Sequence, residues 1–215
     1  MTISEMVDYF DLIQDKYGSP YFTTAEKERF LNQAQLAILS DYLPKQGDKE
    51  NIELNANVWM MVNPLFVSVT TAMNGSGAIL KADIESSLTS SLGFSTTLIR
   101  PLSLSWTDSE GTRPIMGPTR QNNWAKYKNN VFKAPVESDP RYYETNDSYI
   151  IGPADTSAII VVNALRYPRA ISVSGAQTAE LASIYHNEVV GRALEAAGVG
   201  SRDQMMIELN KITQK

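Results

Sequence analysis

Cysteine is absent from this chain of 215 residues, and histidine occurs once, at position 186. Without cysteine there are no disulfides, no thiolate nucleophile, no iron–sulfur cluster and no cysteine-ligated zinc. A single histidine excludes a metal site built from several histidines, and a serine–histidine–acid triad would have to include His186. No complete phosphate-binding or dinucleotide-binding glycine motif is present either. These absences disfavour most familiar enzymes, and we expect no cofactor.

Basic residues and long apolar runs are also scarce. The chain has 19 basic and 24 acidic residues, a net charge of −5, which argues against binding nucleic acid over the whole surface. The longest apolar runs, Val58 to Val62 and Ala158 to Val162, fall far short of the roughly 20 residues that cross a bilayer. The first residues lack the basic start and apolar stretch of a signal peptide. We therefore expect a protein made in a cytoplasm, with no membrane partner.

Both ends of the chain have helical patterns. Two capping boxes, Thr2 with Glu5 and Thr23 with Glu26, precede apolar residues at helical spacing and predict two helices before residue 45. From about residue 175 the pattern is helical again, with Thr178 placed to cap a helix. Because short helix pairs are marginal alone, we expect the two ends to pack into one small bundle.

The middle of the chain changes to strand-like composition, rich in β-branched and aromatic residues. Val58–Met61 is predicted as a strand, and the apolar run Ile159–Val162 as a strand covered on both faces. A short helix is predicted near Gln121–Asn129, and a loop at Ser86–Ser91. The predicted class is α+β: residues 1–44 and 175–215 form the bundle, and residues 45–174 form a β-rich, sheet or barrel-like, insertion.

A basic segment at residues 120–133 is the first candidate site. Its four basic side chains alternate with three aromatic residues, the composition of a surface that binds single strands or phosphates; they are Arg120, Lys126, Lys128 and Lys133. The alternative is an exposed helical turn whose aromatic residues pack inward. We favour the alternative, because the surrounding chain is acidic.

The last residues of the chain are the second candidate. A capped helix is predicted there with a broad apolar surface formed by Met205, Met206, Leu209 and Ile212. Flexible methionines adapt well to a partner's groove, so this helix is a candidate docking element. Completion of the bundle is an equally good explanation. His186, in the middle of a predicted helix, is interpreted as a packing residue.

The order of these elements resembles the head-to-tail adaptor (connector, or ring) proteins of tailed bacteriophages, most closely those of short-tailed and crAss-like phages. Five stretches carry the resemblance, and they follow one another along most of the chain: Phe22–Gln35, Leu98–Leu104, Pro140–Glu144, Ile159–Pro168 and Leu181–Val190. The resemblance is one of layout rather than of a diagnostic motif.

The resemblance implies a structural virion protein without catalytic activity. Copies of the chain, twelve by analogy, would form a homo-oligomeric ring beneath the portal protein, with the C-terminal helix docked on the portal. The β-rich region would contact other tail or ring proteins, and double-stranded DNA would pass through the lumen without specific binding. The alternative function is a nucleic-acid-binding accessory protein that uses residues 120–133.

Overall fold

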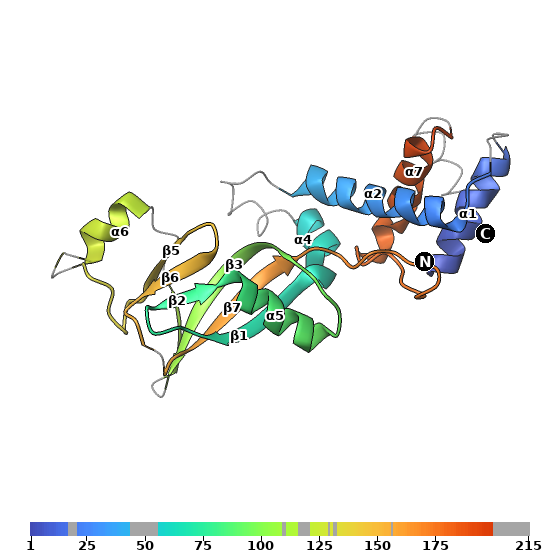
Figure 1. Ribbon diagram of the computed structural model, residues 1–215. Helices are drawn as coiled ribbons and strands as arrows, with labels where there is room; N and C mark the ends of the chain where they lie inside the picture. Colours follow the sequence, from blue (N-terminus) through green and yellow to red (C-terminus); the bar gives the residue numbers. More distant parts are fainter. Residues whose placement is uncertain are drawn as a thin grey trace. The chain divides into compact units, whose positions relative to one another are not determined.

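The computed structural model describes residues 1–16, 21–43, 56–108, 111–115, 121–128, 130, 133–155 and 157–199 (Figure 1). The helices are α1 (Ile3–Lys16), α2 (Thr24–Tyr42), α4 (Ala56–Val62), α5 (Lys81–Leu92), α6 (Gln121–Lys128) and α7 (His186–Ala196), with 3-10 turns η1 (Asn63–Leu65) and η2 (Ser183–Tyr185). The strands are β1 (Phe66–Ala72), β2 (Ala78–Leu80), β3 (Leu98–Asp108), β4 (Gly111–Pro114), β5 (Arg141–Glu144), β6 (Ser148–Gly152) and β7 (Ile159–Arg166). The predicted α+β class, with helices from both ends flanking a strand-rich middle, is confirmed.

The chain divides into two compact units. The helical unit combines Met1–Leu65 with Pro168–Lys215, and the β-rich unit is Phe66–Tyr167. From the sequence we predicted the boundaries between helical and β-rich regions at 44/45 and 174/175, whereas the two units of the structure meet at 65/66 and 167/168. The prediction of a strand at Val58–Met61 is wrong, because these residues form α4, whose Met61 carbonyl accepts a hydrogen bond from the Ala182 N–H at 3.2 Å. This bond ties α4 to the helical unit.

Both predicted capping boxes are present in the helical unit. The Thr2 N–H donates to the Glu5 carboxylate at 2.7 Å, and the Thr23 N–H donates to the Glu26 carboxylate at 2.8 Å. Each threonine hydroxyl accepts a bond from the glutamate N–H in return, at 3.3 Å. These reciprocal bonds satisfy N–H groups that the first turn of a helix leaves without partners. The starts of α1 and α2 are therefore determined locally.

The core of the helical unit forms around α7, which contacts both α1 and α2. Its buried side chains meet apolar side chains from the first two helices, and the largest contributors are Met6, Phe10, Ile13, Leu31, Ile38, Leu39, Val189, Val190 and Leu194. The predicted cap at Thr178 is wrong, because α7 begins only at His186 and the Thr178 hydroxyl donates to the Met1 carbonyl at 3.1 Å. The residues before α7 are held in another way.

Side-chain amides of α2 hold this preceding segment. The Asn32 amide donates to the Ile171 carbonyl at 3.0 Å and accepts from the Ile171 N–H at 2.7 Å, which imitates strand pairing. One turn later, Gln35 donates to the Arg169 carbonyl at 3.2 Å and accepts from the Glu180 N–H at 2.9 Å. Partly buried backbone groups of an irregular segment are thereby satisfied. We call Asn32 and Gln35 the amide clamp.

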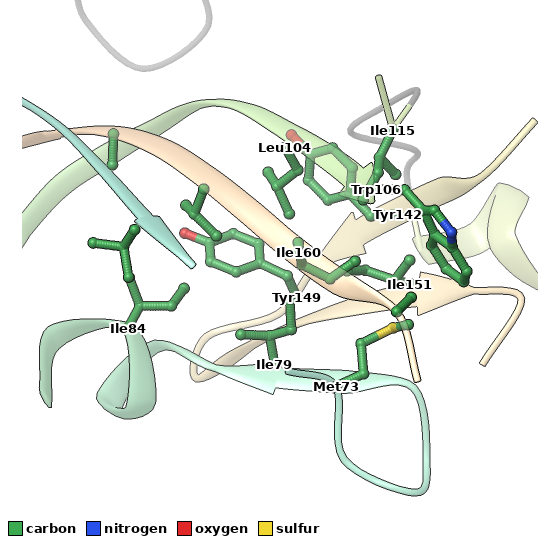
Figure 2. Close-up of a cluster of buried hydrophobic side chains, with 14 of the residues drawn as sticks. Met73, Ile79, Ile84, Leu104, Trp106, Ile115, Tyr142, Tyr149, Ile151 and Ile160 are labelled. Atoms are coloured by element: carbon green, nitrogen blue, oxygen red, sulfur yellow. The ribbon is translucent and has the colours of Figure 1, made fainter. Parts of the chain in front are cut away.

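The β-rich unit contains two antiparallel sheets. One sheet has the strand order β1-β7-β3-β4 and the other has the order β2-β6-β5. In the four-stranded sheet Val162 of β7 lies opposite Val69 of β1 and Leu104 of β3, and all three are buried in one core. Figure 2 shows Leu104 and Ile160 of this sheet in the same cluster as Tyr149 and Ile151 of the other sheet. The two sheets therefore share one hydrophobic core.

The central strand β7 differs from its prediction. Ile160 and Val162 are fully buried, but Ile159 is 51% exposed and Val161 is only half-buried. The strand is thus covered on one face, and the prediction that both faces are covered is wrong at this end. A continuous apolar run arises here because β-branched residues also occupy the open face, where they suit strand geometry.

The predicted loop at Ser86–Ser91 is also wrong, since these residues belong to α5. Ile84 and Leu88, four residues apart, are buried in the core and fix one face of the helix. The Thr89 hydroxyl donates to the Glu85 carbonyl at 2.9 Å, so a residue that competes with the helical backbone instead bonds back to it. Two buried anchors outweigh the poor helix propensity of the serines and threonines. Among the described residues no helix is both long and apolar enough to span a bilayer.

We predict that Asn32→Ala destabilises the helical unit by about 1–3 kcal/mol, because it leaves the partly buried Ile171 N–H and carbonyl without partners. Urea unfolding followed by circular dichroism measures the effect. The control is Gln33→Ala, at the neighbouring exposed position of α2, which we expect to change stability by less than about 0.5 kcal/mol. Equal stability of the two variants would contradict a stabilising role for the amide clamp.

Candidate functional site

The basic segment lies in the β-rich unit, on and after α6. The predicted helix near Gln121–Asn129 is confirmed as α6. Lys126 and Lys128 are exposed on this helix and Lys133 is exposed after it, whereas Arg120 lies outside the described residues. No ion pair joins these three lysines to the part of the chain that the structure describes. They are exposed positive charges on a chain of negative net charge.

The aromatic residues of α6 pack toward their own chain. Trp124 contacts Tyr143 of β5, with ring centroids 5.0 Å apart and an interplanar angle of 48°. The Arg141 guanidinium lies 5.0 Å from the centre of the Tyr127 ring and is held by the Asp139 carboxylate at 2.8 Å. These contacts occupy ring surface that a stacked base would need. The geometry favours the packing interpretation of the aromatic residues and leaves the lysines exposed.

A hollow of about 250 Å³ opens beside Trp124. Most of the residues that line it are of apolar type, and backbone atoms, Lys128 and Ser76 add polar surface; the apolar members are Trp124, Ala134, Pro135 and Ile150–Ala154. Gly152 makes this arrangement possible, since a Cβ at this position would lie 3.0 Å from Trp124 Cη2 and 3.1 Å from Pro135. We call this feature the Trp124 hollow. Sequence reasoning missed it because its walls come from four separate segments.

An ion-pair network supports the segment that carries Pro135. The Arg113 guanidinium donates to both carboxylate oxygens of Asp108, at 3.0 and 3.1 Å, and to the Glu137 carbonyl at 2.7 Å. The Trp106 indole N–H donates to the same carboxylate at 2.9 Å. Hydrogen bonds between a guanidinium and a carboxylate are charge-assisted and therefore stronger than bonds between neutral groups. This network fixes β4 and residues 135–139 to the core, so one wall of the Trp124 hollow is anchored.

His186 lies in the helical unit, at the first residue of α7, and is buried. Its ring nitrogens face the carbonyl oxygens of Met1, at 3.2 Å, and Leu181, at 2.9 Å. Burial lowers the pKa of His186 below its ordinary value of 6.5, although both carbonyls favour the charged form. These contacts describe a residue that joins the start of the chain to α7. As a catalytic base, His186 would need a nucleophilic side chain within hydrogen-bond distance of one ring nitrogen. Both ring nitrogens instead face backbone carbonyl oxygens, which favours the interpretation of His186 as a packing residue.

Other predicted elements receive no test. The candidate docking residues Met205, Met206, Leu209 and Ile212 lie outside the described residues. In the described ranges no three histidine, aspartate or glutamate side chains group to hold a metal ion.

Comparison with known proteins gives no relative. No protein-family model matches the chain, and no curated protein sequence matches it.

We predict that the free energy of unfolding falls as the pH falls from about 7 to about 5, because the unfolded chain binds a proton at His186 before the folded chain does. The loss begins near the ordinary pKa of 6.5 and continues down to the lowered pKa of the folded state. Urea unfolding at several pH values measures the slope.

The control for this prediction is His186→Gln, which removes the only histidine of the chain. We expect its unfolding free energy to be nearly constant over the same pH interval, since the pKa values of Glu5 and Glu26 lie below 4.5. A slope that persists in the glutamine variant would show that other groups cause it.

Proposed function

We propose that the protein is a head-to-tail adaptor of a tailed bacteriophage, a structural virion protein that forms a ring beneath the portal and connects the capsid to the tail. The observation that carries this proposal is the division of the chain. Both ends close one helical unit, and Phe66–Tyr167 form a separate β-rich unit with its own core. This is the element order on which the resemblance to adaptor proteins rests.

The two units suit a ring protein in physical terms. A subunit in a closed ring has two different faces that match each other, and it also contacts components above and below. Two separate cores give such a chain several independent surfaces. Under this proposal the helical unit contacts the portal, with Met205, Met206, Leu209 and Ile212 as docking residues, and the β-rich unit contacts tail components.

The charge of the chain is compatible with a DNA conduit. A net charge of −5 disfavours tight binding of phosphates, and a channel wall that held DNA strongly would slow its passage. Double-stranded DNA is therefore proposed as a transient, non-specific partner. The ring is proposed to be a dodecamer, assembled in the host cytoplasm.

We predict that the purified protein forms rings of one size on the portal protein of the same phage. Negative-stain imaging and mass photometry, with and without the portal, measure this. The expected mass corresponds to a dodecamer, and rings that form without the portal support the proposal equally. A protein that stays monomeric in both conditions would exclude an adaptor.

The exposed lysines of α6 favour one alternative, a nucleic-acid-binding accessory protein. If this function holds, the protein binds single- or double-stranded DNA at low salt, and Lys126→Glu with Lys128→Glu abolishes the binding. Fluorescence anisotropy with a labelled oligonucleotide tests this. A wild-type protein without measurable affinity would exclude the accessory function.

A further inference from the structure

The Trp124 hollow has the size and chemistry of a side-chain anchor site. Its volume of about 250 Å³ is below the roughly 300–1,000 Å³ of pockets that enclose small-molecule ligands. Apolar walls that include Trp124, Pro135 and Gly152 suit one bulky aliphatic side chain that is buried as an anchor in a pocket. The hollow is thus better suited to a protein partner than to a metabolite.

The rim of the hollow is positive. Lys128 lines the hollow itself, and Lys133 precedes Ala134 of the wall. Lys126, two residues before Lys128, lies on the other side of α6 and does not belong to the rim. Lys128 and Lys133 are exposed, and no carboxylate of the described residues forms an ion pair with either of them. A partner that places an apolar side chain in the hollow therefore binds best if carboxylates surround that side chain.

This same chain carries such an element on α1. Glu5, Asp8, Leu12 and Asp15 follow one another at steps of three and four residues and so lie on one face of the helix. All four are exposed, with Leu12 at 50%, on the side opposite the buried residues of α1. Leu12 is thus an apolar side chain with Asp8 one turn before it and Asp15 one turn after it. We call this face the acidic α1 face.

We propose that the acidic α1 face of one copy docks on the Trp124 hollow of a second copy, with Leu12 in the hollow and Asp8 and Asp15 near the lysines of the rim. Charge complementarity selects this occupant. The chain as a whole is acidic, so copies repel each other over most of their surface, and the basic rim is a place where an acidic face is attracted instead.

The contact joins two different surfaces, one on each unit of the chain. Such a heterologous contact leaves a free hollow on one copy and a free helix on the other, so it continues from copy to copy and closes into a ring when the rotation permits. The inference rests on the proposed function for the ring, since it names the surfaces by which ring subunits meet. The contact itself is testable on the purified protein.

The absence of cysteine makes a mixing experiment possible. One variant carries Leu12→Cys and another carries Ser76→Cys, at an exposed position of the hollow's wall. The two are mixed and treated with a short bismaleimide cross-linker, alone and with the portal protein. We expect a cross-linked heterodimer, identified by mass spectrometry of the joined peptides. Because each chain has one thiol, the product can only come from contact between copies.

A matched control is Leu36→Cys, another exposed leucine on a helix of the helical unit, 46% exposed on α2. Mixed with the Ser76→Cys protein, it should give at least tenfold less heterodimer. Equal yields from Leu12→Cys and Leu36→Cys, or no heterodimer in either condition, would overturn the inference.

Charge reversal gives a second, independent measurement. Asp8→Lys with Asp15→Lys, or Lys128→Glu with Lys133→Glu, should weaken self-association about tenfold at low salt, as two lost ion pairs of ordinary strength would. A chain that carries all four changes restores the opposite charges and should recover most of the affinity. Sedimentation velocity measures association, and circular dichroism checks that each variant is folded. Weakening without recovery in the combined variant would count against the contact.

The outcomes separate this inference from the proposed function. Rings on the portal without the Leu12–Ser76 cross-link would overturn the inference and leave the adaptor function in place. A cross-link in a protein that forms no ring, with or without the portal, would support the inference and count against the adaptor function. DNA binding that is lost in the lysine variant, with self-association unchanged, would identify the rim as a nucleic-acid contact and overturn the inference.

Discussion

The helical unit depends on one constraint, the burial of α7 against helices from the other end of the chain. Seven of the 11 residues of this helix are buried, and they include the polar residues His186 and Glu188. It is covered only when α1 and α2 are present, and the amide clamp joins positions 139 residues apart in sequence. The residues between the two parts of the helical unit, Phe66–Tyr167, must therefore fold as an insertion that leaves α7 free to pack on α1 and α2. The β-rich unit meets this requirement with a core of its own.

This constraint explains where polar side chains are buried. The segment that leads into α7 is largely irregular: apart from the bridge between Ser172 and Gln177 and the turn η2, it belongs to no helix or sheet. Asn32 and Gln35 supply hydrogen-bond donors and acceptors to this backbone. The ring nitrogens of His186, the first residue of α7, lie within hydrogen-bond distance of two backbone carbonyl oxygens. In each case a polar side chain satisfies backbone that local structure leaves unpaired. These three polar side chains thus connect segments that are far apart in the sequence.

Local signals in the sequence predicted local features well. The capping boxes at Thr2 and Thr23 need only residues three positions apart, and both are present. The α4 and α5 helices were missed because their composition suggests strand or loop, and only burial of a few anchors such as Met61 and Leu88 makes them helical. The Trp124 hollow could not be predicted, since it exists only after distant segments converge on Gly152. Sequence periodicity carries no information about such convergence.

Composition and placement of charge lead to different conclusions about this chain. The net charge of −5 describes a protein that repels its own copies, and on that ground alone self-assembly is disfavoured. The structure nevertheless places exposed carboxylates on α1, in the helical unit, and exposed lysines on and after α6, in the β-rich unit. Separated opposite charges turn a uniform repulsion into an orientation-dependent interaction that is attractive only when unlike faces meet. For a protein proposed to form a ring this is an advantage, because head-to-tail contacts are favoured and symmetric, dead-end dimers of like faces are not.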